Sequence, residues 1–232
     1  MTPLLLIHGA LGARSQLAAL AAALEPEHPV HLVELEGHGD TPSTSAPFDI
    51  GRFAQNVRGT MRERGLARAA LFGYSMGGYV ALHLAAESPE LVTSVMTLGT
   101  KLAWTPEVAA REVSRLHPAI IRAKVPKFAE VLEQRHVGAG GFELVLAKTA
   151  ALMTSLGDRP LVDATLFGRL AQPVRLMVGD RDSVVSIEET AAATRSIPRG
   201  ELGVLPNTVH PIEQVRAPLL TAMLRDFLAF AV

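Results

Sequence analysis

Residues Gly73-Tyr74-Ser75-Met76-Gly77-Gly78 place a serine between glycines that stand two positions before and after it. A serine hydroxyl can attack a carbonyl carbon when a neighbouring base removes its proton. Such a nucleophile stands on a very tight turn between a strand and a helix, where glycines remove side chains that would collide. The helix amino terminus behind the serine favours developing negative charge. The hexapeptide therefore predicts Ser75 as a nucleophile, provided that a base and an acid lie beside it.

A candidate base and two candidate acids follow later in the chain, each directly after an apolar run that predicts a strand. Asp180 and Asp182 follow the run that ends at Val178, and His210 follows the last such run. The carboxyl ends of parallel strands meet at one edge of a sheet, so we expect these side chains beside Ser75. His210 would be the base, and either aspartate could orient it. The alternatives are a turn role for the aspartates and a helix-capping role for the histidine.

A negatively charged oxygen on the substrate would need two N–H donors to stabilise it. Met76, directly after the serine, supplies one, and the loop after the first strand supplies the other, with the Ala10 amide as the candidate. We expect His8 to be structural and buried under this loop. His38 and Asp40 have no further ligand nearby in the sequence, so we expect no metal site and no cofactor.

Apolar runs alternate with segments of helical spacing along most of the chain. The runs predict strands over residues 3–8, 30–35, 69–73, 91–98, 173–178 and 201–205. The helical spacing predicts helices over residues 13–24, 48–64, 76–87, 187–196 and 212–229. This alternation is typical of βαβ units. We therefore predict an α/β fold with a mostly parallel central sheet of about six strands flanked by helices.

The alternation breaks at residues 101–163, which show helical runs punctuated by prolines and no clear strand. We therefore expect a core domain made of residues 1–100 and 164–232, and a small helical insertion over residues 101–163. Trp104 lies where the chain leaves the sheet, and we expect it to line the substrate pocket, because such pockets are mostly apolar. The alternative is that Trp104 packs the insertion onto the core.

Composition and charge exclude several classes of protein. The chain has 232 residues, of which 48% are hydrophobic, and its net charge is −1 with no cluster of Lys and Arg, so we expect no nucleic-acid partner. It has no cysteine, which excludes disulfides and thiolate chemistry. No apolar stretch approaches the roughly 20 residues that span a bilayer, so we expect no membrane partner. We expect a cytoplasmic protein that binds a small molecule.

Taken in order, the His8-Gly9 pair, the Gly37-His38-Gly39 turn, the serine hexapeptide and the late aspartate and histidine loops resemble the α/β-hydrolase superfamily over essentially the whole chain. In that family the acid usually stands three residues after the glycine that ends its strand. The resemblance therefore implies Asp182 rather than Asp180 as the acid. It also implies that the insertion is a lid domain that shapes substrate choice.

Relatives usually begin with an antiparallel hairpin ahead of the strand over residues 3–8, whereas this chain starts directly at that strand. The resemblance implies that the strand over residues 30–35 lies outermost, beside the position of the hairpin. Glu34 and Glu36 are expected to charge this edge, and charge discourages pairing between sheet edges of two chains. We therefore expect a monomer.

The resemblance implies a serine esterase acting on a small carboxylic ester or related acyl compound through a Ser75–His210–Asp182 triad. One alternative is a carbon–carbon bond hydrolase of ring-cleavage products that uses the same triad. Its acidic substrate would need a cation, and four side chains of the insertion could supply one: Arg111, Arg115, Arg122 and Lys124. Another alternative is a small-molecule receptor without turnover, which has no physical need for an intact triad.

Overall fold

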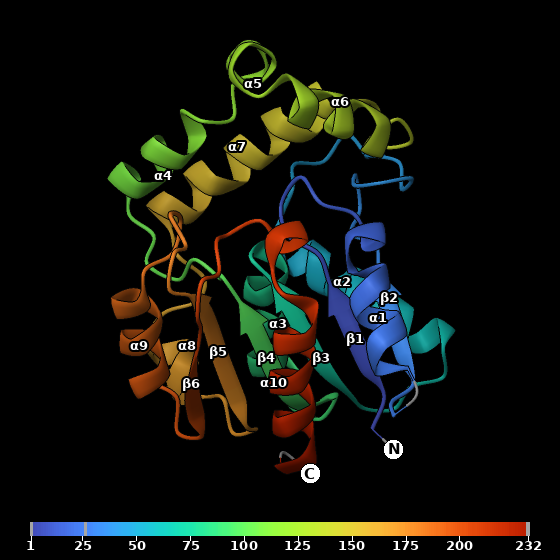
Figure 1. Cartoon of the computed structure of the whole chain (residues 1–232), viewed down its shortest axis with the longest axis vertical. Coiled ribbons are helices and arrows are strands. Elements are labelled where there is room, and N and C mark those ends of the chain that lie inside the picture. Colours follow the sequence, from blue (N-terminus) through green and yellow to red (C-terminus); the bar gives the residue numbers. More distant parts are fainter. Residues whose placement is uncertain (1, 26, 231–232) are drawn as a thin grey trace.

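Six parallel strands form one sheet within residues 2–25 and 27–230, the part of the chain that the computed structural model describes. The strands are β1 (Leu4–Ile7), β2 (Val30–Val33), β3 (Ala69–Tyr74), β4 (Val92–Leu98), β5 (Val174–Gly179) and β6 (Gly200–Leu205). Their order across the sheet is β2-β1-β3-β4-β5-β6, and every neighbouring pair is parallel. The predicted fold class is confirmed, and Figure 1 shows the sheet between its flanking helices.

Helices cover both faces of the sheet because alternate strand side chains enter two apolar layers. In β1, Leu5 and Ile7 join one layer and Leu4 and Leu6 join the other, since successive strand side chains point to opposite faces. The first layer is covered by α2 (Ile50–Glu63), α3 (Met76–Glu87), α8 (Ala164–Gly168) and α9 (Ile187–Arg195). The second layer is covered by α1 (Ala18–Leu24) and α10 (Ala217–Phe230).

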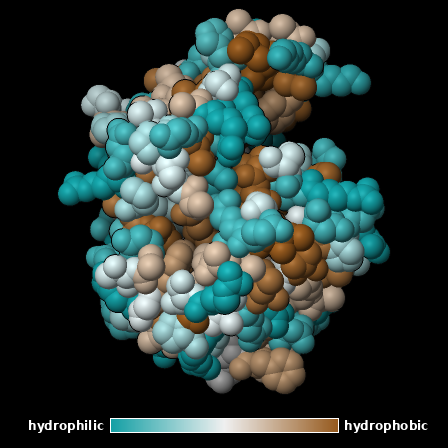
Figure 2. Space-filling model, turned by 90° about the vertical axis from the view of Figure 1, so that its left-hand side faces the viewer, coloured by the Kyte–Doolittle hydropathy of each residue, from teal (hydrophilic) through white to brown (hydrophobic). Residues whose placement is uncertain are grey.

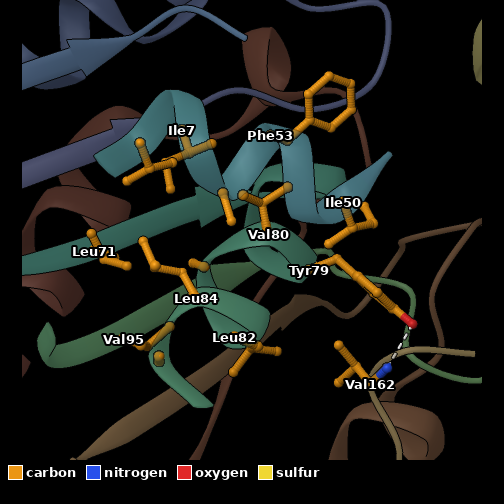
Figure 3. Packing of buried hydrophobic residues seen from close by; sticks show 14 of the residues in the cluster. Ile7, Ile50, Phe53, Leu71, Tyr79, Val80, Leu82, Leu84, Val95 and Val162 are labelled. Carbon is orange, nitrogen blue, oxygen red and sulfur yellow. Dashed lines mark hydrogen bonds between the residues drawn. The ribbon is translucent and has the colours of Figure 1, made fainter. Parts of the chain in front are cut away.

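The first layer also contacts the segment that leads from the helical insertion back to the sheet. Figure 3 shows Val80 of α3 among strand side chains and Ile50 of α2 beside Tyr79, whose side chain points toward Val162. The Tyr79 hydroxyl accepts hydrogen bonds from the amides of Leu161 and Val162, at 3.0 and 2.9 Å. This hydroxyl therefore holds the returning segment against α3.

Four helices form a separate layer over the carboxyl ends of the strands (Figure 1). They are α4 (Pro106–Val113), α5 (Pro118–Lys124), α6 (Pro126–Arg135) and α7 (Phe142–Asp158), and we call them the helical layer. The first three begin with proline, whose missing N–H costs nothing at that position. Figure 2 shows this layer above the body of the molecule, with apolar side chains at the level where the two meet.

Two predicted helices are each divided in the structure. Residues 13–24 form a 3₁₀ turn over Arg14–Leu17 before α1 begins. Residues 212–229 form a 3₁₀ turn over Ile212–Gln214, an extended residue at Val215, and then α10. Helical spacing of apolar residues does not distinguish a 3₁₀ turn followed by a helix from one continuous helix.

The strand β2 lies at the edge of the sheet, as expected, but the two glutamates do not charge that edge. Both follow the end of β2, and both are paired. Glu34 lies 3.0 Å from His8 and 3.7 Å from Arg14, and Glu36 lies 2.7 Å from Arg52. The expectation that Glu34 and Glu36 blunt the edge is therefore wrong, because Glu34 turns inward to His8 and Glu36 is paired with Arg52 beyond the end of β2.

Candidate active site

Ser75 stands on the turn between β3 and α3 with a φ of 51°, in the left-handed region. The glycines around it make the turn possible. A Cβ on Gly73 would collide with the backbone of Gly77, and a Cβ on Gly77 would collide with the backbone of Ile7. The Ser75 amide donates to Leu98 at 2.8 Å, which anchors the turn to β4. The predicted strand–turn–helix context of this serine is therefore present.

His210 and Asp182 are hydrogen-bonded to each other, with 2.8 Å between Nδ1 of the histidine and Oδ2 of the aspartate. The other carboxylate oxygen of Asp182 accepts from the amides of Val184 and Val185, at 2.8 and 2.9 Å. Burial alone would raise the pKa of Asp182, but these hydrogen bonds and the charge of His210 hold its pKa below the usual range. The carboxylate is therefore ionised at neutral pH and is hydrogen-bonded to Nδ1 of the imidazole.

Asp180 links the loop after β5 to the loop after β6 instead of contacting His210. Its Oδ1 accepts from the amide of Thr208 at 3.0 Å, and its side chain is exposed. The hydrogen bonds from the amides of Asn207 and Thr208 lower the pKa of Asp180. The structure thus brings Asp182, and not Asp180, to His210.

The loop after β1 carries the Ala10 amide, which has no hydrogen-bond acceptor among the residues that the structure describes. The carbonyl of the same peptide, that of Gly9, accepts from His8 Nδ1 at 2.8 Å and from the Gly12 amide at 3.1 Å. These two donors fix the direction of the Ala10 N–H. Met76 is the first residue of α3, where helix amides have no acceptor within the helix.

The helical layer holds this loop as well. The Leu11 carbonyl accepts from Nη1 of Arg135 and from Nε2 of His136, both at 3.0 Å. Leu11 has a φ of 57°, so these contacts stabilise a backbone conformation that is unfavourable for leucine. Nδ1 of His136 accepts from the Gly39 amide at 3.2 Å, which defines a neutral ring with its proton on Nε2. Sequence reasoning missed both donors.

His8, His38 and His136 form a buried cluster beneath the site. The rings of His8 and His38 lie 5.1 Å apart, and those of His38 and His136 lie 5.9 Å apart. Burial, together with the neighbouring histidines, holds the pKa of His38 well below its usual range. The expectation that His8 lies buried under its loop agrees with this arrangement.

Two cavities meet at Ser75. The inner one has about 60 Å³, is mostly apolar, and is lined by Trp104 among others. The outer one has about 270 Å³ and includes His210 in its wall. Both are lined by Ser75, Ala10, Glu112, Met153 and Val184. A larger cavity of about 420 Å³ lies at the amino ends of the strands, far from these groups.

Two charged residues of the cavity walls were missed by sequence reasoning. Lys101 lies 3.1 Å from Glu189, whose other oxygen accepts the amides of Leu102 and Ala103 at 2.7 and 2.8 Å. Glu112 of α4 is largely buried and pairs with neighbouring arginines of the helical layer. The pairing of Lys101 leaves no local signal, because Glu189 is close in space but distant in sequence.

Residues 2–25 and 27–230 contain no group of three or more acidic or histidine side chains placed to hold a metal ion. Among the same residues, no helix has the length and apolar character that crossing a bilayer requires.

Residues 2–160 match the model of the alpha/beta hydrolase fold family, and the chain belongs to this family. The chain is therefore an α/β hydrolase, an enzyme of the hydrolase class.

Two curated relatives illustrate the range of activities among similar chains. A pimeloyl-(acyl-carrier protein) methyl ester esterase of Neisseria meningitidis serogroup B is 26% identical over 239 residues, covering 96% of this chain and 91% of the relative. An acetyltransferase component of an acetoin cleaving system from Pseudomonas putida is 27% identical over 243 residues. That match covers 98% of this chain, which spans 63% of the length of that relative.

Solved structures agree in fold. A thermophilic esterase from Thermogutta terrifontis superposes with a TM-score of 0.78 at 25% identity, covering 99% of this chain and 90% of the other. An enol-lactonase from Burkholderia xenovorans gives a TM-score of 0.80 at 20% identity, covering 99% and 92% of the two chains. The second likeness concerns the fold alone.

Proposed function

We propose that this enzyme is a serine hydrolase that cleaves a small carboxylic ester or a related acyl compound through an acyl-enzyme. The observation that carries the proposal is the hydrogen bond between Asp182 and His210, made at the wall of a cavity that Ser75 also lines. A buried carboxylate with two backbone donors and one imidazole partner is suited to orient a general base.

In the proposed reaction, Ser75 Oγ attacks the carbonyl carbon while His210 Nε2 takes the hydroxyl proton. The amides of Ala10 and Met76 donate to the oxyanion, and Asp182 stabilises the imidazolium. The ester C–O bond then breaks, and His210 gives its proton to the departing alcohol. Water attacks the acyl-enzyme in the same way and releases the carboxylic acid and the free serine.

We also propose that residues 101–163 act as a lid on this site. Support comes from the position of the helical layer over the carboxyl ends of the strands. Residues of α4 and α7, including Glu112 and Met153, line both cavities at Ser75. A lid in this position would exclude water and shape the substrate pocket.

Turnover of p-nitrophenyl butyrate, together with covalent labelling by a fluorophosphonate, tests the proposal. We expect turnover by the parent protein and one phosphonyl adduct on Ser75 in a peptide digest. The variant Ser75→Ala should show neither, with an unchanged circular dichroism spectrum. A labelled and active Ser75→Ala variant would exclude this residue as the nucleophile, and a parent without turnover would favour the receptor alternative.

A carbon–carbon hydrolase with the same triad is the second candidate, because Arg115 lines the outer cavity and could meet an acidic substrate. However, both Arg111 and Arg115 pair with Glu112, at 3.2 and 3.1 Å. Arg122 pairs with Glu133 and Glu143 instead. Loss of the visible absorbance of a ring-cleavage dienoate, faster than ester turnover, would favour this candidate.

A further inference from the structure

The two cavities at Ser75 are lined by different groups of the proposed mechanism. His210 lines the outer cavity, whereas Met76, whose amide is a proposed oxyanion donor, lines the inner one. The general acid must reach the oxygen of the departing alcohol, because it protonates that oxygen as the ester bond breaks. The alcohol therefore lies in the outer cavity, and the acyl group lies in the inner one.

The inner cavity is small and has a rigid back wall. Ile50 and Tyr79 are almost completely buried, and the Tyr79 hydroxyl is held by the amides of Leu161 and Val162. The inner cavity, at about 60 Å³, has room for only a few non-hydrogen atoms, because a single water already needs about 10–15 Å³. The carbonyl group takes part of this space, so the cavity favours a short acyl chain.

The outer cavity is more than four times larger, at about 270 Å³, and opens to solvent. Its wall includes Leu116 and the half-exposed Phe128 of the helical layer. Each charged group of both walls lies within 3.3 Å of an opposite charge: Lys101 of Glu189, Glu112 of Arg115, and Arg135 of Glu213. The cavities therefore favour a substrate without net charge, because each charged group that lines them already has a charged partner.

We propose that the substrates of this enzyme are uncharged esters with a short acyl group and a bulkier, partly apolar alcohol. The proposal rests on the serine hydrolase function above and assigns its two substrate subsites. Ser75 Oγ forms its bond to the short acyl carbon, and the bulky alcohol leaves with the proton from His210.

Measurement of kcat/KM over p-nitrophenyl esters from acetyl to decanoyl tests the acyl subsite. We expect a maximum between propionyl and pentanoyl and a value at least about tenfold lower for octanoyl. Leu152→Ala enlarges the inner cavity and should raise the octanoyl-to-butyryl ratio at least about tenfold. Trp104→Leu should also raise this ratio. The acyl subsite can therefore still be tested if thermal melting shows that one of the two variants does not fold.

The alcohol subsite is tested with ethyl and benzyl butyrate, which share one acyl group. We expect a higher kcat/KM for benzyl butyrate, and Phe128→Ala should reduce this preference without changing the acyl-length maximum. Val137→Ala is the matched control, because this residue of the helical layer is 75% exposed, and both preferences should stay unchanged.

An octanoyl or longer maximum in the parent protein would overturn the subsite assignment, as would an unchanged length profile in folded Leu152→Ala and Trp104→Leu. Higher activity on methyl esters of long acids than on benzyl butyrate would reverse the two subsites. In each of these cases Ser75→Ala still abolishes turnover, so the proposed function survives. Absence of turnover on every ester would overturn both.

Discussion

Asp182→Asn separates the orienting role of this carboxylate from its structural role. The asparagine can keep its oxygen on the Val184 and Val185 amides, where Oδ1 of Asp182 now accepts two hydrogen bonds. Its NH₂ group then faces Nδ1 of His210, and two donors cannot face each other. The imidazole must therefore carry its proton on Nε2, where it cannot accept the proton of Ser75.

The opposite orientation of the asparagine restores the working tautomer but leaves two buried amides facing an NH₂ group. Each unsatisfied buried donor costs about 1–3 kcal/mol, so this orientation is disfavoured by about 2–6 kcal/mol. At about 1.36 kcal/mol per factor of ten, kcat should decrease by about 30-fold to about 10⁴-fold. The upper end equals the loss of about 10⁴-fold that the same change causes in a well-studied serine protease triad.

The assay is kcat on p-nitrophenyl butyrate at saturating substrate, with a thermal melt of each variant. Asp180→Asn is the matched control, because it makes the same chemical change two residues earlier, on an exposed side chain that contacts Thr208. Its kcat should stay within about fivefold of the parent. A larger loss in Asp180→Asn than in Asp182→Asn would refute the assignment of the acid.

Three further outcomes are expected. Ser75→Ala should reduce kcat by on the order of 10⁶ without unfolding, measured by ester turnover and thermal melting. The unfolded chain binds a proton at His38 near pH 6.5, whereas the folded chain keeps this ring neutral to a lower pH, so stability should decrease as the pH falls below about 6.5. Denaturant titrations from pH 7 to 5 should show this decrease in the free energy of unfolding. His38→Phe should reduce its slope against pH by at most about 1.4 kcal/mol per pH unit. An unchanged slope in this variant would contradict the lowered pKa of His38. Light scattering tests the monomer expected from the sequence: a single monomeric mass would support it, and a dimer built through β2, whose edge Glu34 and Glu36 do not charge, would overturn it.

Local patterns were sufficient for the parts of the site that depend on the backbone. The turn at Ser75 could be predicted because each glycine around it removes a specific collision. The strand β1 could be predicted because both of its faces are covered, which requires an unbroken apolar run. The family resemblance gave the outermost position of β2, and the order of the other strands came from the structure. Residue types alone left Asp180 and Asp182 as equal candidates. The resemblance favoured Asp182, and in the structure their partners, Thr208 and His210, separate the two.

Contacts between distant segments could not be predicted in this way. Arg135 and His136 reach Leu11 across 124 and 125 residues, and a surface arginine or a lone histidine in a helix carries no sign of such a partner. Glu189 is similar, because its three donors come from residues 101–103. The burial of the Glu34 side chain could not be predicted either, since a glutamate near a strand end is usually exposed to solvent.

The bonds from Arg135 and His136 to the Leu11 carbonyl have a consequence for engineering this enzyme. Lids are attractive units for exchange between relatives, because a chimera can in principle combine one catalytic core with another substrate range. Here two donors of the exchanged unit hold the loop that carries the Ala10 amide. A transplanted helical layer without an arginine and a histidine at these places would leave Leu11 free to relax from its left-handed conformation. If the Ala10 amide is an oxyanion donor, such a chimera should lose activity on all esters alike, and restoring these two residues is the first repair to attempt.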